Sequence, residues 1–123
     1  GVVSMKDFFP IGELIDRYLI ALIKFQKTGL NLVELNWYNE RIKNFDLDSI
    51  RSEMDDLKQA HLNIWAMESS LRSGLEENVG FAEIGRRAIK IRDYNGQRII
   101  AKNAIAKKLN CPVIEYKKDH LSE

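Results

Sequence analysis

The stretch from Asp48 to Glu77, DSIRSEMDDLKQAHLNIWAMESSLRSGLEE, decides the expected fold. Neither Gly nor Pro interrupts it before Gly74. Eight of its residues recur at alternating steps of four and three, which is the heptad spacing of a helix that packs along one seam. These residues are Ile50, Met54, Leu57, His61, Ile64, Glu68, Leu71 and Leu75. The spacing predicts one α-helix of about eight turns.

Composition and charge narrow the class of protein. The chain has 123 residues, of which 45% are hydrophobic, 30% are charged and two are proline. A chain of this length can bury a core as one domain, and so few prolines argue against disorder and against a turn-rich β-sandwich. The 19 Lys and Arg residues nearly balance the 18 Asp and Glu residues. We therefore expect a single helical domain over residues 1–123, with neither nucleic acid nor a membrane as its partner.

The cysteine count and the apolar runs bear on location. Cys111 is the only cysteine, so it cannot form a disulfide within the chain, which fits a reducing compartment. No charged and then apolar leader is recognised, and the apolar run Tyr18–Ile23 is far too short to span a bilayer. These observations predict a cytoplasmic protein.

A first helix is expected from Pro10 to about Thr28. Proline is accepted in a first helical turn, and Gly29 is a typical C-terminal stop. Apolar residues lie on most sides of this helix, and its middle has few polar side chains: Glu13, Asp16, Arg17 and Lys24. Such a helix either lies at the centre of the bundle or packs partly against a second copy of the chain, and we favour a homodimer.

Two more helices complete the expected fold. Asn31, followed by Glu34, is a capping signal for a short second helix that ends near Asn44. After a polar reversal that ends at Gly80, a fourth helix is expected over residues 81–109. The expected architecture is an all-α bundle of about four helices, in which helices three and four form a long antiparallel hairpin.

Two features of the chain ends and of the fourth helix qualify this expectation. The pair Asn95 and Gly96 is typical of a turn, so residues 81–109 could be two helices, although we expect one. Residues 1–7 are expected to be a flexible lead-in. Residues 111–123 are expected to be an extended tail beyond Pro112, which ends helical structure.

Polar residues in the seam are the unusual signal of the sequence. His61 and Glu68 occupy positions where a seam needs apolar residues, and Trp65 lies between them. In an antiparallel hairpin with its loop near Val79, residues whose numbers sum to about 159 face each other. This rule gathers five residues into one predicted cluster: His61, Glu68, Asn95, Arg98 and Lys102.

Three interpretations of this cluster are open. In the one that we favour, Glu68 pairs with Arg98 or Lys102, and the cluster fixes the register of the helices in a binding or assembly module. In the second, the cations and the imidazole of His61 bind a small anionic metabolite such as a carboxylate, a phosphate or a sugar nucleotide, and Glu68 exchanges a proton. In the third, the cluster is a solvated face. Whether the protein is an enzyme is left open.

Metal and cofactor chemistry have little support. The only two histidines, His61 and His120, are far apart and do not form a metal-ligand spacing. The carboxylates of the expected helices do not follow a paired magnesium-binding signature and are typical of solvated helix faces. No glycine-rich phosphate loop is found. We expect no metal and no cofactor.

Three blocks of the sequence resemble a known family. The first is Ile11–Arg17 with Ile20, Ile23 and Lys24; the second is Ile64, Trp65, Met67, Glu68, Leu71 and Arg72; the third is Asn95, Arg98, Lys102 and Ile105. They are similar to a family of short helical bacterial and phage proteins described only as a domain of unknown function, which is sometimes attached to glycosyltransferases. The resemblance points to nine positions: Glu13, Asp16, Lys24, Trp65, Glu68, Arg72, Asn95, Arg98 and Lys102. His61 stands where the family has Asn.

Overall fold

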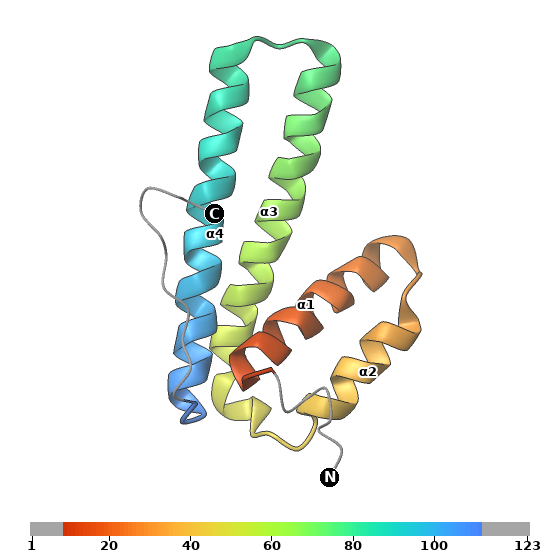
Figure 1. The fold of residues 1–123 in the computed structure, drawn as a ribbon, viewed down its shortest axis with the longest axis vertical. Helices are drawn as coiled ribbons and strands as arrows, with labels where there is room; N and C mark the ends of the chain where they lie inside the picture. Colours follow the sequence, from red (N-terminus) through yellow and green to blue (C-terminus); the bar gives the residue numbers. More distant parts are fainter. Residues whose placement is uncertain (1–8, 112–123) are drawn as a thin grey trace.

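The computed structural model describes residues 9–111, which form four α-helices and no strand within that range (Figure 1). The elements are α1 (Ile11–Thr28), α2 (Leu32–Ile42), a short 3-10 helix η2 (Leu47–Ile50), α3 (Arg51–Glu77) and α4 (Phe81–Lys108). The expected all-α fold with a long hairpin of the last two helices is confirmed. The expected lead-in, and the expected tail beyond Cys111, lie outside the described residues.

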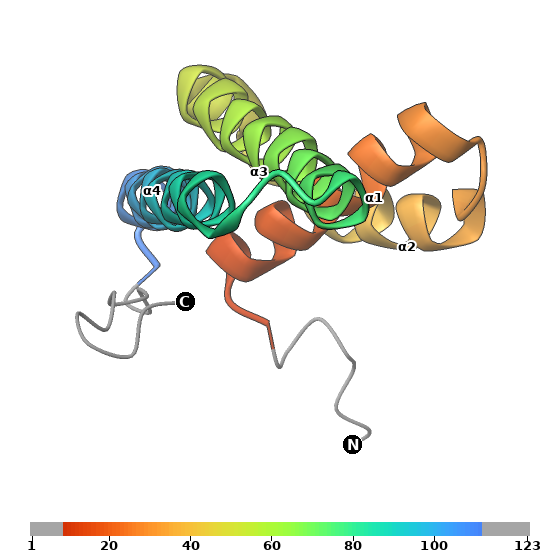
Figure 2. The same ribbon diagram turned by 90° about the horizontal axis from the view of Figure 1, so that it is seen from above.

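Helices α3 and α4 lie side by side along the longest axis of the molecule (Figure 1). Figures 1 and 2 show α1 and α2 on one side of this hairpin, next to the half that contains the start of α3 and the end of α4. Among residues 9–111, no helix lies beside the other half of the hairpin (Figure 1). We call residues 62–97 the distal hairpin, and the rest of the described chain the base.

Helix α1 is the central helix of the base. It contacts α2, α3 and α4. Six of its apolar residues are buried, on several sides of the helix: Ile11, Leu14, Ile15, Leu19, Ala21 and Ile23. Contacts with three helices explain how so apolar a helix is covered within one chain. Gly29 ends α1 in a left-handed conformation, and its N–H donates to the carbonyl oxygen of Phe25.

The core of the base joins residues that are far apart in the sequence. Ile15, Ile42, Ile50, Leu57 and Ile105 are fully buried, and they come from all four helices and from η2. Burying a side chain of this size stabilises the fold by about 1.5–3 kcal/mol. This cluster therefore holds the start of α3 and the end of α4 firmly against α1 and α2.

Helix α3 begins three residues later than expected. Residues 47–50 form η2, and the carboxylate of Asp46 accepts a hydrogen bond from the backbone N–H of Ser49 at 3.3 Å. This cap starts the tighter turn before the α-helix, which is a common way for a helix to begin. At the other end of α3, Asn78 and Gly80 adopt positive φ angles of 57° and 97°, which reverse the chain into α4.

Helix α4 is one continuous helix through Asn95 and Gly96, as expected. The side chain of Asn95 accepts a hydrogen bond from Nε of Arg98 at 2.8 Å, one turn further along the same helix. That contact uses the side-chain oxygen that would otherwise favour a turn.

The seam of the hairpin differs from the expected one toward its tip. Glu68 and Leu75 belong to the predicted seam, but both are exposed, whereas Ala60 and Gly74 are buried. The reason is that an α-helix has 3.6 residues per turn, so a strict heptad series rotates by about 20° per heptad. Between Ile50 and Leu75 this rotation amounts to about 70°. Residues at exact heptad spacing thus start in the core and end on the surface.

Candidate functional site

The polar cluster of the base is centred on the carboxylate of Asp16 on α1. The side chain of Asp16 is only 7% exposed. Its Oδ1 lies 2.7 Å from Nε2 of His61 on α3, and its Oδ2 accepts from Nη1 of Arg98 on α4 at 3.2 Å. Because an ionised carboxylate can only accept, His61 donates through Nε2. One buried side chain therefore ties three helices together.

The pKa of Asp16 lies below its ordinary value of 3.8. Burial is the largest influence and raises this pKa, but the hydrogen bond from His61 and the positive charges of His61, Arg98 and Lys102 together outweigh burial. Asp16 is therefore ionised at neutral pH, although it is buried.

A second buried cation joins α4 to α1 next to this carboxylate. The side chain of Lys102 is 5% exposed, and its Nζ donates to Oε1 of Glu13 at 2.5 Å. A Cβ at Gly12 would lie 3.4 Å from both Cγ and the carbonyl oxygen of Lys102. The absence of a side chain at Gly12 thus lets α4 and its lysine pass close to α1.

The structure brings together only part of the predicted cluster. His61, Asn95, Arg98 and Lys102 meet at the junction of the helices, as the hairpin rule predicted. Glu68 is exposed and forms no ion pair within residues 9–111. The expected pairing of Glu68 with Arg98 or Lys102 is therefore wrong. The carboxylates that pair with these two cations come from α1, which a rule for two helices could not place.

The carboxylates of α1 had one signal in the sequence. Glu13 and Asp16 are among the few polar residues of an otherwise apolar helix, and the family resemblance also pointed to them. A buried helix tolerates a charge only where a partner compensates it. This rule could have suggested that both residues need cationic partners, although the sequence does not identify those partners.

The remaining predicted residues lie outside the ion network. Trp65 and Glu68 line a hollow of about 250 Å³ between α1 and α3, with Ile20, Ile23, His61 and Ile64. The ammonium group of Lys27 lies 5.6 Å from the ring centre of Trp65. Lys24 is half-buried and Arg72 is exposed, and neither forms an ion pair within the described part of the chain.

A wider hollow of about 610 Å³ lies between α1 and α2, and the sequence had not pointed to it. Its lining includes Phe9, Trp37 and Tyr38. Arginines already cover two of these rings: Arg17 lies 4.5 Å from the centre of Phe9, and Arg41 lies 3.7 Å from the centre of Trp37. Each of these cation–π contacts covers one face of its ring.

The polar cluster is chemically closed. Arg98 and Lys102 each pair with a carboxylate of α1, and His61 shares the carboxylate of Asp16. An added anion would have to displace Asp16 or Glu13 from contacts that are mostly shielded from water. Within residues 9–111, no group of three or more His, Cys, Asp or Glu side chains could hold a metal ion. The arrangement is suited to fixing helices in place.

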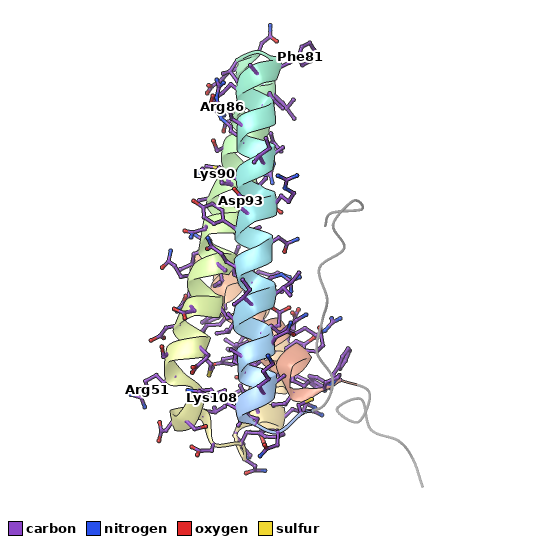
Figure 3. All side chains as sticks on the ribbon, turned by 90° about the vertical axis from the view of Figure 1, so that its left-hand side faces the viewer. Arg51, Phe81, Arg86, Lys90, Asp93 and Lys108 are labelled. Carbon is purple, nitrogen blue, oxygen red and sulfur yellow. The ribbon has the colours of Figure 1, made fainter. Side chains whose placement is uncertain are left out.

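The distal hairpin is the second unusual feature. Among residues 62–97 only Gly74 is buried, whereas the base contains the whole buried core of the described chain. Large apolar side chains are exposed on it, with Leu75 at 64% and Phe81 at 96% of their surface accessible. Figure 3 shows Phe81 at the tip, and Arg86, Lys90 and Asp93 along α4.

The described residues define an all-α protein in which Asp16 and Glu13 of α1 bind side chains of α3 and α4. Helices α3 and α4 extend beyond these contacts as the distal hairpin. Comparisons with protein-family models, with curated proteins and with solved structures found no match. None of the helices within the described residues is long and apolar enough to cross a membrane.

Proposed function

We propose that this protein is an assembly module that forms a homodimer through its distal hairpin. The observation that supports the proposal most strongly is the contrast in burial: the distal hairpin buries Gly74 alone, although it contains more than half of α3 and of α4. Helices in proteins gain most of their stability from packing an apolar face against a neighbour. In this hairpin a large part of that packing is left for another molecule.

The exposed apolar residues supply the driving force for association. Phe81 and Leu75 lie on the two helices next to the reversal. Burying one such side chain contributes about 1.5–3 kcal/mol. A dimer with a two-fold axis would bury both copies of each residue. Their burial would supply a substantial part of the binding free energy of a micromolar complex, which is about 8 kcal/mol.

In this proposal the polar cluster is the part that orients the hairpin. Asp16 holds α3 and α4 at a fixed angle to α1. Removing one partner of a buried ion pair typically destabilises a protein by about 3–5 kcal/mol, so the orientation is strongly held. A rigidly presented hairpin loses less conformational freedom on binding than a flexible one.

A binding site or enzyme for a small anionic metabolite is the alternative proposal, with Arg98, Lys102, His61 and Glu68 as its residues. It is supported by the presence of two buried cations and an imidazole in one cluster. It requires the ligand to displace carboxylates that already pair with these groups. For this reason the geometry favours assembly.

Location and family are further parts of the proposal. A cytoplasmic location is supported by the single cysteine. A relationship to the helical family of unknown function is supported by the meeting of residues from two of its separate blocks. Glu13 and Asp16 from the first block pair with Lys102 and Arg98 from the third.

Sedimentation velocity over about 1–500 µM protein tests the proposed homodimer, since this range covers micromolar and weaker association. We expect the parent to shift from monomer to dimer with concentration, and the double variant Leu75→Ser, Phe81→Ser to remain a monomer. Val33→Ser is the matched control, because Val33 is 85% exposed on α2, outside the hairpin. Circular dichroism confirms that each variant is folded.

The outcomes are distinct. A parent that stays monomeric over the whole range contradicts self-association. So does a double variant that is folded and dimerises as tightly as the parent. Loss of the dimer in Val33→Ser would place the interface on α2 instead.

A further inference from the structure

We infer that the two hairpins pair antiparallel, with α3 of one chain against α4 of the other. The inference rests on the proposed homodimer and specifies the surfaces that meet. In this arrangement the acidic end of each α3 lies beside the basic middle of the partner's α4. The tip of each hairpin covers the middle of the other.

The charges of the two helices are strongly unequal. Helix α3 has six acidic and three basic residues, whereas α4 has eight basic and two acidic residues. Between these two helices the described structure has one ion pair, from Lys108 to Glu53 at 2.8 Å, and it lies in the base. Surfaces of opposite sign on one chain are complementary to each other in a second copy.

In the distal hairpin most of these charges lack an ion pair with any other described residue. Glu76 and Glu77 on α3, and Lys90 and Arg92 on α4, are all exposed and form no ion pair within residues 9–111. Arg86 pairs with Glu83 on its own helix. Asp93, next to Arg92, is also exposed and forms no ion pair within these residues. The charges available to a partner are therefore acidic at the end of α3 and, with two cations to one carboxylate, net basic in the middle of α4.

The end of α3 is also a place where acidic residues are unfavourable locally. The last turn of α3 contains Glu76 and Glu77 and no basic residue. The carboxyl end of a helix carries partial negative charge, which repels carboxylates. Cations from a second molecule would relieve this repulsion.

Distances along the helices select the antiparallel arrangement. At 1.5 Å per residue, Lys90 and Arg92 lie about 14 and 17 Å from Phe81, while Glu76 and Glu77 are at the tip. If two tips lay side by side in parallel, opposite charges would be separated by more than the Debye length of about 8–10 Å. In an antiparallel pair that overlaps by about 15 Å, Lys90 and Arg92 come level with the partner's Glu76 and Glu77, and two-fold symmetry repeats the arrangement. Residues two apart project from nearly opposite sides of a helix, so one of the two cations faces the partner.

The same charges argue against a membrane or nucleic acid as the partner. An anionic surface laid along the hairpin would attract Lys90 and Arg92 but would repel Glu76 and Glu77 at the tip. The overlap is also small, because two helices about 10 Å wide over about 15 Å give about 300 Å² of face per chain. This is below the standard interface of about 800 Å² per partner, so we expect weak, salt-sensitive association.

A charge-swap experiment tests the pairing in sedimentation velocity at low salt. One variant carries Glu76→Lys and Glu77→Lys, and the other carries Lys90→Glu and Arg92→Glu. In each variant alone, like charges would face each other, and we expect association at least about tenfold weaker than in the parent. In an equimolar mixture, each α3 would meet an α4 of opposite sign, and we expect the heterodimer to form with parental affinity.

The control removes the same amount of acidic charge elsewhere on α3. Asp55→Lys with Asp56→Lys changes two exposed residues of the base, and we expect it to dimerise as the parent does. If the parent dimerises but the mixture does not recover, the pairing of α3 with α4 is wrong while the homodimer stands. A monomeric parent overturns both. Sedimentation of the parent with anionic phosphatidylserine vesicles would instead assign α4 to a membrane surface.

Discussion

At the scale of single residues, Asp16 has the most consequential environment in the molecule. Its two oxygens are shared between His61 and Arg98, which belong to different helices. Each partner is itself largely shielded from water, with 10% and 15% of its side chain exposed. Removing the carboxylate would leave the side chains of His61 and Arg98 without this buried hydrogen-bond acceptor.

We therefore expect Asp16→Ala to lower the free energy of unfolding by about 3 kcal/mol at neutral pH, the lower end of the range for breaking a buried ion pair. Urea denaturation followed by circular dichroism measures this change. The matched control is Asp48→Ala. Asp48 pairs with Arg51 at 2.6 Å, but its side chain is 85% exposed, so little change is expected. Equal effects of the two substitutions would show that the buried network contributes no more than a surface pair.

The ionisation of Asp16 also predicts how the free energy of unfolding changes with pH. The pKa of Asp16 is lower in the folded protein than the ordinary value of 3.8. The unfolded chain therefore binds more protons in acid, and the stabilisation by Asp16 is present above about pH 4 and is lost as pH falls through the folded pKa. The difference between the parent and Asp16→Ala should shrink over this acidic range, as thermal denaturation at a series of pH values would show.

At the scale of elements, local sequence signals set where each helix begins and ends. They do not set which face of the helix is buried. The cap of Asp46 and the positive φ angles of Asn78 and Gly80 bound α3 with little help from the rest of the molecule. The face that α3 presents to α4 depends on helical rotation over its full length. Glu68 illustrates the difference, because its heptad position is regular and its side chain is exposed.

Two of the four glycines of the distal hairpin, Gly80 and Gly85, give a prediction at this scale. A Cβ at Gly85 would meet nothing within 4 Å, and Gly85 lies inside α4. Gly85→Ala should raise the stability by about 1 kcal/mol, because alanine restricts the unfolded chain and favours helix. Gly80→Ala is the contrasting variant, since φ at Gly80 is +97° and alanine would be strained there. Urea denaturation should show opposite signs, and a loss of stability in Gly85→Ala would contradict the open surface.

At the scale of the whole molecule, the chain divides into a packed base and a thinly covered hairpin. Stability is unevenly distributed in such a structure, because segments with few buried contacts open at lower free energy. We expect amide hydrogen exchange to be slow in the base, near Ile15 and Ile105, and faster between residues 62 and 97 at low protein concentration. Protection of the distal hairpin should rise with concentration as the dimer forms. Uniformly slow exchange along α3 at all concentrations would contradict this division.

The sequence by itself determined the helical class, the four helices and the reversal near Val79, because periodicity, caps and positive-φ residues act over a few neighbouring positions. It also indicated that His61, Asn95, Arg98 and Lys102 belong together, since an antiparallel hairpin relates them by simple counting. Only the tertiary structure decided which carboxylates compensate the buried cations. Those contacts join Asp16 and Glu13 to residues more than forty positions away. They depend on where α1 crosses the hairpin, which the core of the base sets and no local spacing encodes.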